Sequence, residues 1–154
     1  MNALNWNCWG LGNQHAVSVL SHLMREKAPK IVFLTETKQT VDEMRKIKDE
    51  LNFQGGLVVP CDGSWGGLAM LWKEEVNLHI QAYSPHHIDA IIVTDPGVPW
   101  GITGFYGYFE ECRKHESWTL LRHLHSWLFL PWKCIGDYNE ILSSEEKQGQ
   151  ISKA

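Results

Sequence analysis

The chain has 154 residues, of which 44% are hydrophobic and 21% are charged, a composition typical of an ordinary globular domain. This length suits one domain over residues 1–154, with an interior large enough to cover many of its eight tryptophans. The net charge of −4 argues against a broad nucleic-acid-binding surface, which needs an excess of Lys and Arg, but leaves room for a local basic groove.

Targeting signals and disulfides are not indicated. The N-terminal MNALNWNCWG lacks the basic start and long apolar run of a secretory signal. The most apolar stretch, residues 127–132, is too short for a membrane span and contains Pro131. The four cysteines are far apart and form no CxxC pair, which favours reduced thiols over a disulfide framework or a zinc site. We expect an intracellular protein, nuclear or cytoplasmic, without a membrane segment.

The first part of the chain predicts a strand, a helix and a second strand. Residues 3–8 form the first strand, and a turn at residues 10–13 ends it. Residues 31–34 form an unbroken apolar strand of the kind that is buried on both faces. Between these strands, helical spacing predicts an apolar stripe of Ala16, Val19, Leu20, Leu23 and Met24.

A second helix and two hairpins follow. Thr40 and Glu43 have the spacing of a capping box at the start of the helix. The Gly-rich turn at residues 62–67 is not a phosphate-binding P-loop, because no Lys-Ser/Thr pair and no helix follow it. Arg45, Lys46 and Lys48 are the solvated face of the helix. The hairpin strands are predicted at residues 57–59, 68–72, 76–82 and 88–93.

The last third repeats the first pattern. A strand at residues 102–106, a helix at residues 118–128 and a strand at residues 132–135 give a second strand–helix–strand unit. A crossover through one helix makes the two strands of each unit parallel. The chain is therefore predicted to be an α/β protein.

In such sheets, ligands bind beyond the carboxyl ends of the parallel strands. The first unit ends its strands at Asn7 and Glu36, and the second ends its strands at Tyr106 and Asp137, with Asn139 close behind. If the two units face each other, these five side chains share one crevice. Taken alone, the Gly-Asp-Tyr-Asn sequence at residues 136–139 is better explained as a turn, and only the other residues in register favour a site.

The chemistry of this set points to a hard cation and a phosphate. Two carboxylates with amides and a phenol, without Cys or His, suit Mg²⁺, which keeps positions for water and phosphate oxygens. The amide and phenol groups can hold phosphate oxygens, and a carboxylate away from the metal can deprotonate an attacking water. A competing metal set, His86 and His87 with Asp89, is better explained as the start of a strand.

Five segments in order resemble the endonuclease/exonuclease/phosphatase superfamily, which includes deoxyribonuclease I and the apurinic/apyrimidinic endonucleases. The most similar members are the N-terminal endonuclease domains of plant LINE-type (non-LTR) retrotransposon proteins. The resemblance runs from Asn5 to about Gly149. It is carried by LNWNCWGLGN, IVFLTETK, GLAMLWKEEV, TGFYG and WKCIGDYNEIL.

The resemblance implies a four-layer α-β-β-α sandwich that hydrolyses phosphoesters, DNA above all, with Mg²⁺ or Mn²⁺. By position, it assigns Glu36 to the metal and Asn7 to hydrogen bonds within the site. Tyr106 would contact the scissile phosphate, Asp137 would orient the nucleophilic water, and Asn139 would bond to the phosphate or its neighbours. Full-length relatives carry a downstream reverse transcriptase domain.

Two departures separate the chain from that pattern. Trp9 stands where relatives of the plant type usually carry Arg, which removes a positive charge near the DNA. After Asn139 the chain reads EILSSEEKQGQISKA, without the later Asp and the Asp-His pair that complete the family's site. The chain therefore resembles the domain truncated at its C-terminus, with an incomplete second sheet. Open sheet edges favour self-association and marginal solubility.

Three functions remain open on the sequence. The first is a Mg²⁺-dependent DNA endonuclease of the LINE type. The second is a catalytically silent remnant or interaction fragment, and the third is a phosphatase or small-substrate phosphodiesterase of the same superfamily.

Overall fold

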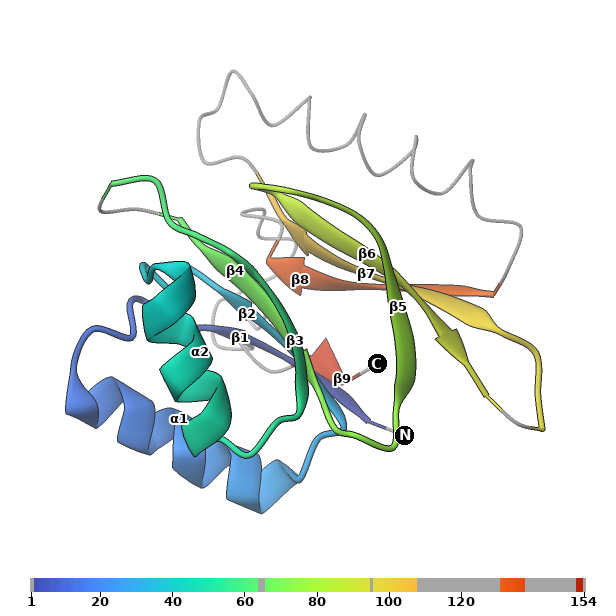
Figure 1. The fold of residues 1–154 in the computed structure, drawn as a ribbon, viewed down its shortest axis with the longest axis horizontal. Helices are drawn as coiled ribbons and strands as arrows, with labels where there is room; N and C mark the ends of the chain where they lie inside the picture. Colours follow the sequence, from blue (N-terminus) through green and yellow to red (C-terminus); the bar gives the residue numbers. More distant parts are fainter. Residues whose placement is uncertain (1, 64–65, 95, 108–130, 138–151, 154) are drawn as a thin grey trace, which may run out of the picture.

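Two β-sheets face each other, and two helices cover the outer face of the first sheet (Figure 1). The computed structural model describes residues 2–63, 66–94, 96–107, 131–137 and 152–153. The first sheet has the strand order β3-β4-β2-β1-β9. Its strands are β1 (Ala3–Asn7), β2 (Ile31–Thr35), β3 (Gly55–Val59), β4 (Leu68–Trp72) and β9 (Ser152–Lys153).

β1 and β2 are parallel, in register from Ala3 opposite Ile31 to Asn7 opposite Thr35. This confirms the parallel arrangement predicted for the first strand–helix–strand unit. β4 pairs with the other side of β2 and is antiparallel to it, and β3 pairs with β4 as a hairpin. On the far side of β1, the short strand β9 is antiparallel.

α1 (Gln14–Lys27) begins at Asn13, whose side-chain oxygen accepts a hydrogen bond from the backbone N–H of Ala16. Such a cap satisfies one of the free donors at a helix start. The buried face differs from the predicted stripe at one position, because Val19 is exposed and Val17 is buried in its place. The face that packs on the sheet is made by Val17, Leu20, Leu23 and Met24.

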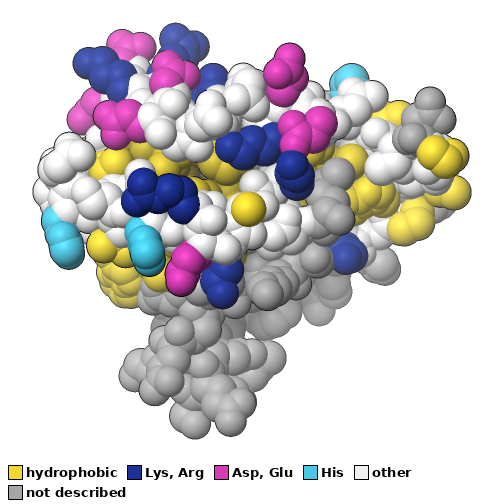
Figure 2. Space-filling view, turned by 90° about the horizontal axis from the view of Figure 1, so that it is seen from below, with side chains coloured by type: hydrophobic (Ala, Val, Ile, Leu, Met, Phe, Trp, Pro, Cys, Tyr) yellow, Lys and Arg dark blue, Asp and Glu magenta, His cyan; other side chains and the backbone are white. Residues whose placement is uncertain are grey.

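α2 (Val41–Glu50) has the predicted capping box. The Thr40 hydroxyl accepts from the Glu43 backbone N–H at 3.3 Å, and the Glu43 carboxylate accepts from the Thr40 backbone N–H at 3.1 Å. Arg45 and Lys46 are exposed, as predicted for a solvated face. Figure 2 shows Lys, Arg, Asp and Glu side chains interspersed on the face seen from below, so that face has no field of one sign.

β2 has apolar side chains on both faces because it lies between two cores. Val32 and Leu34 pack with the helices in one buried cluster. Ile31 and Phe33 point the other way, into a second cluster shared with the second sheet. The alternation follows from the two-residue period of a strand, and it confirms that this apolar run is buried on both faces.

The second sheet has the order β5-β6-β7-β8 among the described strands. β7 and β8 are parallel, as predicted, from Gly101 opposite Trp132 to Tyr106 opposite Asp137. The helix predicted at residues 118–128, which would make the fourth layer, lies outside the described residues. The strands are β5 (Asn77–Ser84), β6 (His87–Val93), β7 (Trp100–Tyr106) and β8 (Trp132–Asp137).

β8 continues through Gly136 to Asp137. The strand predicted at residues 132–135, with Gly136 ending it, is therefore two residues too short. Gly136 has a φ of +150°, and a Cβ there would lie 1.8 Å from the carbonyl oxygen of Phe105. The glycine is needed because β8 approaches the backbone of β7 closely at this point.

Another glycine sets the distance between the two sheets. A Cβ on Gly104 of β7 would lie 2.4 Å from Cδ1 of Phe33, the β2 side chain that points into the inter-sheet core. Phe33 is fully buried, so its ring has no room to move away.

We therefore expect Gly104→Ala to lower the free energy of unfolding by about 1–3 kcal/mol, the usual cost of overpacking a dense core. Urea unfolding followed by tryptophan fluorescence measures the change. Gly12→Ala is the matched control, because its new Cβ would lie 3.7 Å from the nearest atom, in ordinary contact. Equal midpoints for the two variants would contradict the role assigned to Gly104.

Candidate active site

The carboxyl ends of both parallel pairs carry the polar residues that the sequence predicts for the site. β1 ends at Asn7, β2 ends one residue before Glu36, and β7 and β8 end at Tyr106 and Asp137. β1, β2 and β8 all run toward the left side of the molecule in Figure 1. The side at which these strands end is called the polar rim below.

Glu36 and Tyr106 meet at the polar rim from opposite sheets. The Tyr106 hydroxyl donates a hydrogen bond to Oε1 of Glu36 at 2.8 Å. Both side chains are buried, with exposed fractions of 1% for Tyr106 and 7% for Glu36. The second carboxylate oxygen, Oε2, is buried without a hydrogen-bond partner among the described residues. A buried carboxylate oxygen in this state has lost its water and gained nothing in exchange, which is costly unless a ligand completes it.

The loops after β1 and β2 are joined to each other. The backbone N–H of Gly10 donates to the carbonyl of Glu36 at 2.8 Å, and that of Leu11 donates to the carbonyl of Thr37 at 2.9 Å. Trp9, Glu36 and Lys38 all have positive φ angles, between 51° and 55°. Such angles cost a non-glycine residue about 1–3 kcal/mol and persist only where the surroundings impose them.

The Gly-rich turn between β3 and β4 supports the Glu36 loop from the other side. The carbonyls of Gly66 and Gly67 accept hydrogen bonds from the backbone N–H groups of Lys38 and Thr37, at 2.9 and 3.2 Å. A Cβ on Gly67 would lie 2.4 Å from the Thr37 hydroxyl, so a side chain there would displace the loop. The turn is thus a backbone brace, followed by a strand rather than by a helix.

Asn7 and Asp137 lie at the same rim. The side-chain oxygen of Asn7 accepts from the backbone N–H of Trp9 at 3.1 Å, and Asn7 is buried. Asp137 is opposite Tyr106 in the register of β7 and β8, and Asn139 lies outside the described residues. The structure therefore brings Glu36 and Tyr106 into contact and sets the backbone of Asp137 beside Tyr106. The catalytic roles of all five residues stay predictions.

Near the site lie three further buried side-chain oxygens whose residues the sequence analysis did not single out. Oδ1 of Asn5 and the hydroxyls of Thr35 and Thr37 are buried without a hydrogen-bond partner among the described residues. Asn5 precedes Asn7 by two residues, so both face the second sheet, as does Thr35 opposite Asn7. Two amides at a spacing of two residues, at the end of an otherwise apolar strand, were the signal in the sequence.

This donor set fits a hard divalent cation. One carboxylate oxygen without a partner, surrounded by amide and hydroxyl oxygens, is the environment that Mg²⁺ accepts, since that ion keeps several waters and needs few protein ligands. Within the described part of the chain, no group of three His, Cys, Asp or Glu residues forms a metal cluster. The fit therefore rests on Glu36 and its neighbours and not on a complete cage of protein ligands.

Cys8 lies beside the site but does not have the properties of a nucleophile. Burial, helped by the nearby charge of Glu36, raises the pKa of its thiol far above the ordinary value. A thiol that stays protonated is inert, because the thiolate is the reactive form. Cys8 is a small buried residue of the core.

The stretch from His86 to Asp89 does not form one ligand set. Nδ1 of His86 lies 3.0 Å from the carbonyl oxygen of Tyr106, and its ring is stacked on the Tyr106 ring. Nδ1 of His87 lies 2.6 Å from the Ser84 hydroxyl. Asp89 accepts from the Thr103 hydroxyl at 2.9 Å. His86 is thus a neighbour of the site residue Tyr106, whereas His87 and Asp89 have separate partners.

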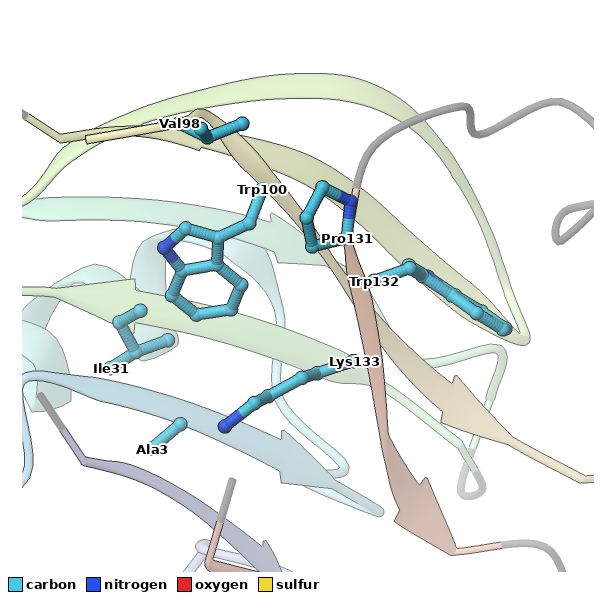
Figure 3. A pocket seen from close by; sticks show the side chains of 7 residues that line it. All are labelled: Ala3, Ile31, Val98, Trp100, Pro131, Trp132 and Lys133. Atoms are coloured by element: carbon cyan, nitrogen blue, oxygen red, sulfur yellow. The ribbon is translucent and has the colours of Figure 1, made fainter.

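A cavity of about 400 Å³ lies at the opposite ends of the strands. It contains none of the predicted site residues. In Figure 3 the Trp100 ring and the Lys133 side chain point into the space between the sheets, toward Ala3 and Ile31. Its apolar floor offers no group for hydrolysis, so the polar rim is the better candidate for chemistry. The lining residues are Ala3, Ile31, Val98, Trp100, Pro131, Trp132 and Lys133.

Two facing sheets with a buried carboxylate at the ends of parallel strands define the class of the protein as a mixed α/β fold of the deoxyribonuclease I type. The sequence pattern of the endonuclease/exonuclease/phosphatase family matches residues 4–148. The chain therefore belongs to this family. No curated protein sequence shows significant similarity to it.

Solved structures with the same fold include several different proteins. The human Nocturnin catalytic domain has a TM-score of 0.69 at 15% identity, over 96% of this chain and 67% of that one. An AP endonuclease from Archaeoglobus fulgidus has a TM-score of 0.66 at 15% identity, over 94% and 59%. The endonuclease domain of TRAS1, a telomere-specific non-LTR retrotransposon, has 0.62 at 12%, over 91% and 59%. The chain thus spans about three fifths to two thirds of these proteins, and the likeness shows the fold alone. In the described residues, no helix has the length and apolarity to cross a membrane.

The burial of Asp89, which accepts a hydrogen bond from Thr103, can be tested through the pH dependence of stability. Burial raises the pKa of Asp89 above its ordinary value of 3.8, and the hydrogen bond from Thr103 offsets only part of this effect. A raised pKa in the folded state means that the Asp89 contribution to stability is full below pH 3.8 and is lost as the pH rises through the folded pKa.

We expect Asp89→Asn to gain stability relative to the parent chain as the pH rises above about 4, and the gain to level off once Asp89 is ionised in the folded state. Urea midpoints measured from pH 3.5 to pH 8 follow the effect. Asp49→Asn, at an exposed position on α2, is the control. A difference in urea midpoint between Asp89→Asn and the parent that does not change with pH would contradict the raised pKa of Asp89.

Proposed function

We propose that this protein hydrolyses phosphodiester bonds in DNA with the help of a divalent metal ion, as an endonuclease of the LINE retrotransposon type. Membership of the endonuclease/exonuclease/phosphatase family supports phosphoester chemistry. The observation that carries the proposal is the buried Glu36 carboxylate, which Tyr106 holds through Oε1 and whose Oε2 has no hydrogen-bond partner in the described part of the chain.

Glu36 is the metal-binding residue in this proposal. Its loop is braced by hydrogen bonds from Gly10 on one side and to Gly67 through Thr37 on the other, so its carboxylate is set in place before any ligand arrives. Pre-organised groups of this kind stabilise a transition state without a cost of rearrangement. A bound Mg²⁺ or Mn²⁺ would neutralise charge that builds on the phosphate as the bond breaks.

Tyr106 first positions Glu36. Its single hydroxyl proton is used in the bond to Oε1, so a contact with the scissile phosphate requires the O–H to turn away from Glu36. The two functions can follow one another: Tyr106 holds the carboxylate in the free protein, and its hydroxyl would turn to a phosphate oxygen when substrate is bound.

The remaining predicted residues complete the reaction. Asp137 aligns and deprotonates the attacking water, a task for a carboxylate that is away from the metal. Its register position beside Tyr106 supports this assignment. Asn139 donates to a phosphate oxygen. Asn7 orders the loop after β1 through its bond to Trp9.

DNA as the substrate and the LINE type as the branch are supported by the segments that resemble plant LINE proteins and by the fold shared with the TRAS1 endonuclease domain. In proteins of that type, a downstream reverse transcriptase domain would extend from the nicked strand. We also propose that residues 1–154 form one domain and that its sheets favour self-association.

A silent remnant is the second candidate. A small-substrate phosphodiesterase or phosphatase is the third candidate. It would use the same proposed residues, but the polar rim would bind a small phosphoester instead of DNA.

The nicking of supercoiled plasmid in Mg²⁺ separates these candidates. We expect Glu36→Ala and Asp137→Ala each to lower the nicking rate by at least about 100-fold, as loss of a metal ligand or a general base does. Glu50→Ala, at an exposed position on α2, should nick at the parental rate. Nicking that survives both site changes would refute the mechanism. An inactive parent would favour the silent remnant, and turnover of nucleotide phosphoesters alone would favour the third candidate.

Metal binding has a readout that does not depend on turnover. A cation that binds only the folded chain raises the unfolding free energy by about 2.7 kcal/mol at 100 times its dissociation constant. We expect Mg²⁺ or Mn²⁺ to raise the melting temperature of the parent and of Glu50→Gln but not of Glu36→Gln, by differential scanning fluorimetry. Equal shifts in all three proteins would place the cation elsewhere.

A further inference from the structure

Trp9 is a large aromatic residue held in water at the polar rim. Its exposed fraction is 67%, and it lies two residues after Asn7, on the loop between β1 and α1. Its backbone N–H donates to the Asn7 side chain at 3.1 Å, and the next residue, Gly10, donates to the carbonyl of Glu36 at 2.8 Å. The loop that carries Trp9 is therefore hydrogen-bonded to Asn7 and Glu36, two residues of the candidate site.

The backbone at Trp9 is strained. Its φ of 51° lies in the left-handed region, which disfavours a bulky residue. Hydrogen bonds to Asn7 and to Glu36 hold the backbone in this conformation, so the Cα–Cβ bond of Trp9 leaves the loop in a set direction. An apolar ring of this size gains free energy by burial, yet 67% of Trp9 is exposed. An exposed aromatic on a strained loop beside a candidate site is a feature typical of ligand contact.

A positive charge accompanies the ring. Lys38 is exposed, and its Cδ would lie 3.4 Å from a Cβ on Gly10, the residue after Trp9. The Lys38 side chain thus lies beside the loop that carries Trp9, on the same rim. With a net charge of −4 on the chain, the rim has no broad basic field for duplex DNA, so affinity has to come from short-range contacts.

Nucleobases and phosphates are the groups that an aromatic ring next to a lysine recognises together. Stacking on an aromatic side chain needs one free face of a base. In an intact duplex, both faces of each base are covered by its neighbours, whereas an unpaired base has a free face.

We infer that Trp9 is a stacking platform for an unpaired nucleobase next to the phosphate that is cleaved. The inference rests on the proposed function and narrows its substrate to single-stranded DNA or to duplex with a gap, bubble or frayed end. Lys38 pairs with the adjacent phosphate.

Binding without turnover tests the platform separately from hydrolysis. The dissociation constants are to be measured by fluorescence anisotropy in EDTA, with a labelled single-stranded oligonucleotide and with a blunt hairpin duplex of the same composition. We expect the parent to bind the single strand more tightly than the duplex. Trp9→Ala should weaken single-strand binding by roughly tenfold or more, as loss of one stacked base does, and should leave duplex binding unchanged.

Three further variants define the contact. Trp9→Phe keeps a ring and should retain most of the affinity. Trp9→Arg should lose the single-strand preference and steepen the salt dependence by about one released ion. Tyr83→Ala removes the exposed aromatic of β5, 61% exposed, and should bind like the parent.

The outcomes are distinct. Equal binding by the parent and Trp9→Ala, or duplex binding as tight as single-strand binding, would overturn the inference, as would an equal loss in Tyr83→Ala. Loss in Trp9→Ala with no nicking by the parent would leave the platform standing and remove the hydrolytic function. Binding of neither nucleic acid would reject the platform and point to a protein contact for the ring.

Discussion

The hydrogen bond from Tyr106 to Glu36 is the contact on which the candidate site depends. It is the point where a side chain of the second sheet reaches a charged side chain of the first, in a region from which water is excluded. A single donor satisfies only part of a carboxylate, and Oε2 has no hydrogen-bond partner among the described residues. The positive φ angles of Trp9, Glu36 and Lys38 add backbone strain at the same place. A cation bound at Oε2 would offset the cost of burying the carboxylate.

Much of the fold follows from hydrophobic periodicity. The two parallel strand pairs, the capping box at Thr40, and the doubly buried β2 are local patterns whose physical causes act within a few residues or one crossover. The residues predicted to end the strands are also within one position of the observed ends. The choice of Val19 for the buried face of α1 failed because neighbouring apolar positions compete for the same face, and only the packing partner decides between Val17 and Val19.

Other features depend on contacts that are distant in sequence. The hairpins of the middle region were expected, but nothing local indicates that β4 joins β2 while β6 joins β7, in separate sheets. The bond between Tyr106 and Glu36 spans 70 residues and arises only when the sheets face each other. The roles of Gly104 and Gly136 are of the same kind, since the atoms that exclude a Cβ, on Phe33 and Phe105, belong to other strands. In the candidate site, the residue types could be predicted, whereas the partner of each carboxylate oxygen could not.

The pairing of β1 with β9 has a consequence for the order in which the molecule assembles. Leu4 is opposite Lys153 and Asn5 is opposite Ser152, so a strand synthesised among the first receives one of its neighbours from residues far along the chain. Closing so long a loop is entropically unfavourable and slow compared with forming hairpins. On the ribosome, β1 acquires β2 early, and its other edge waits until residues 152–153 have been synthesised. The strand that carries Asn7 therefore stays half-paired while the rest of both described sheets is already available.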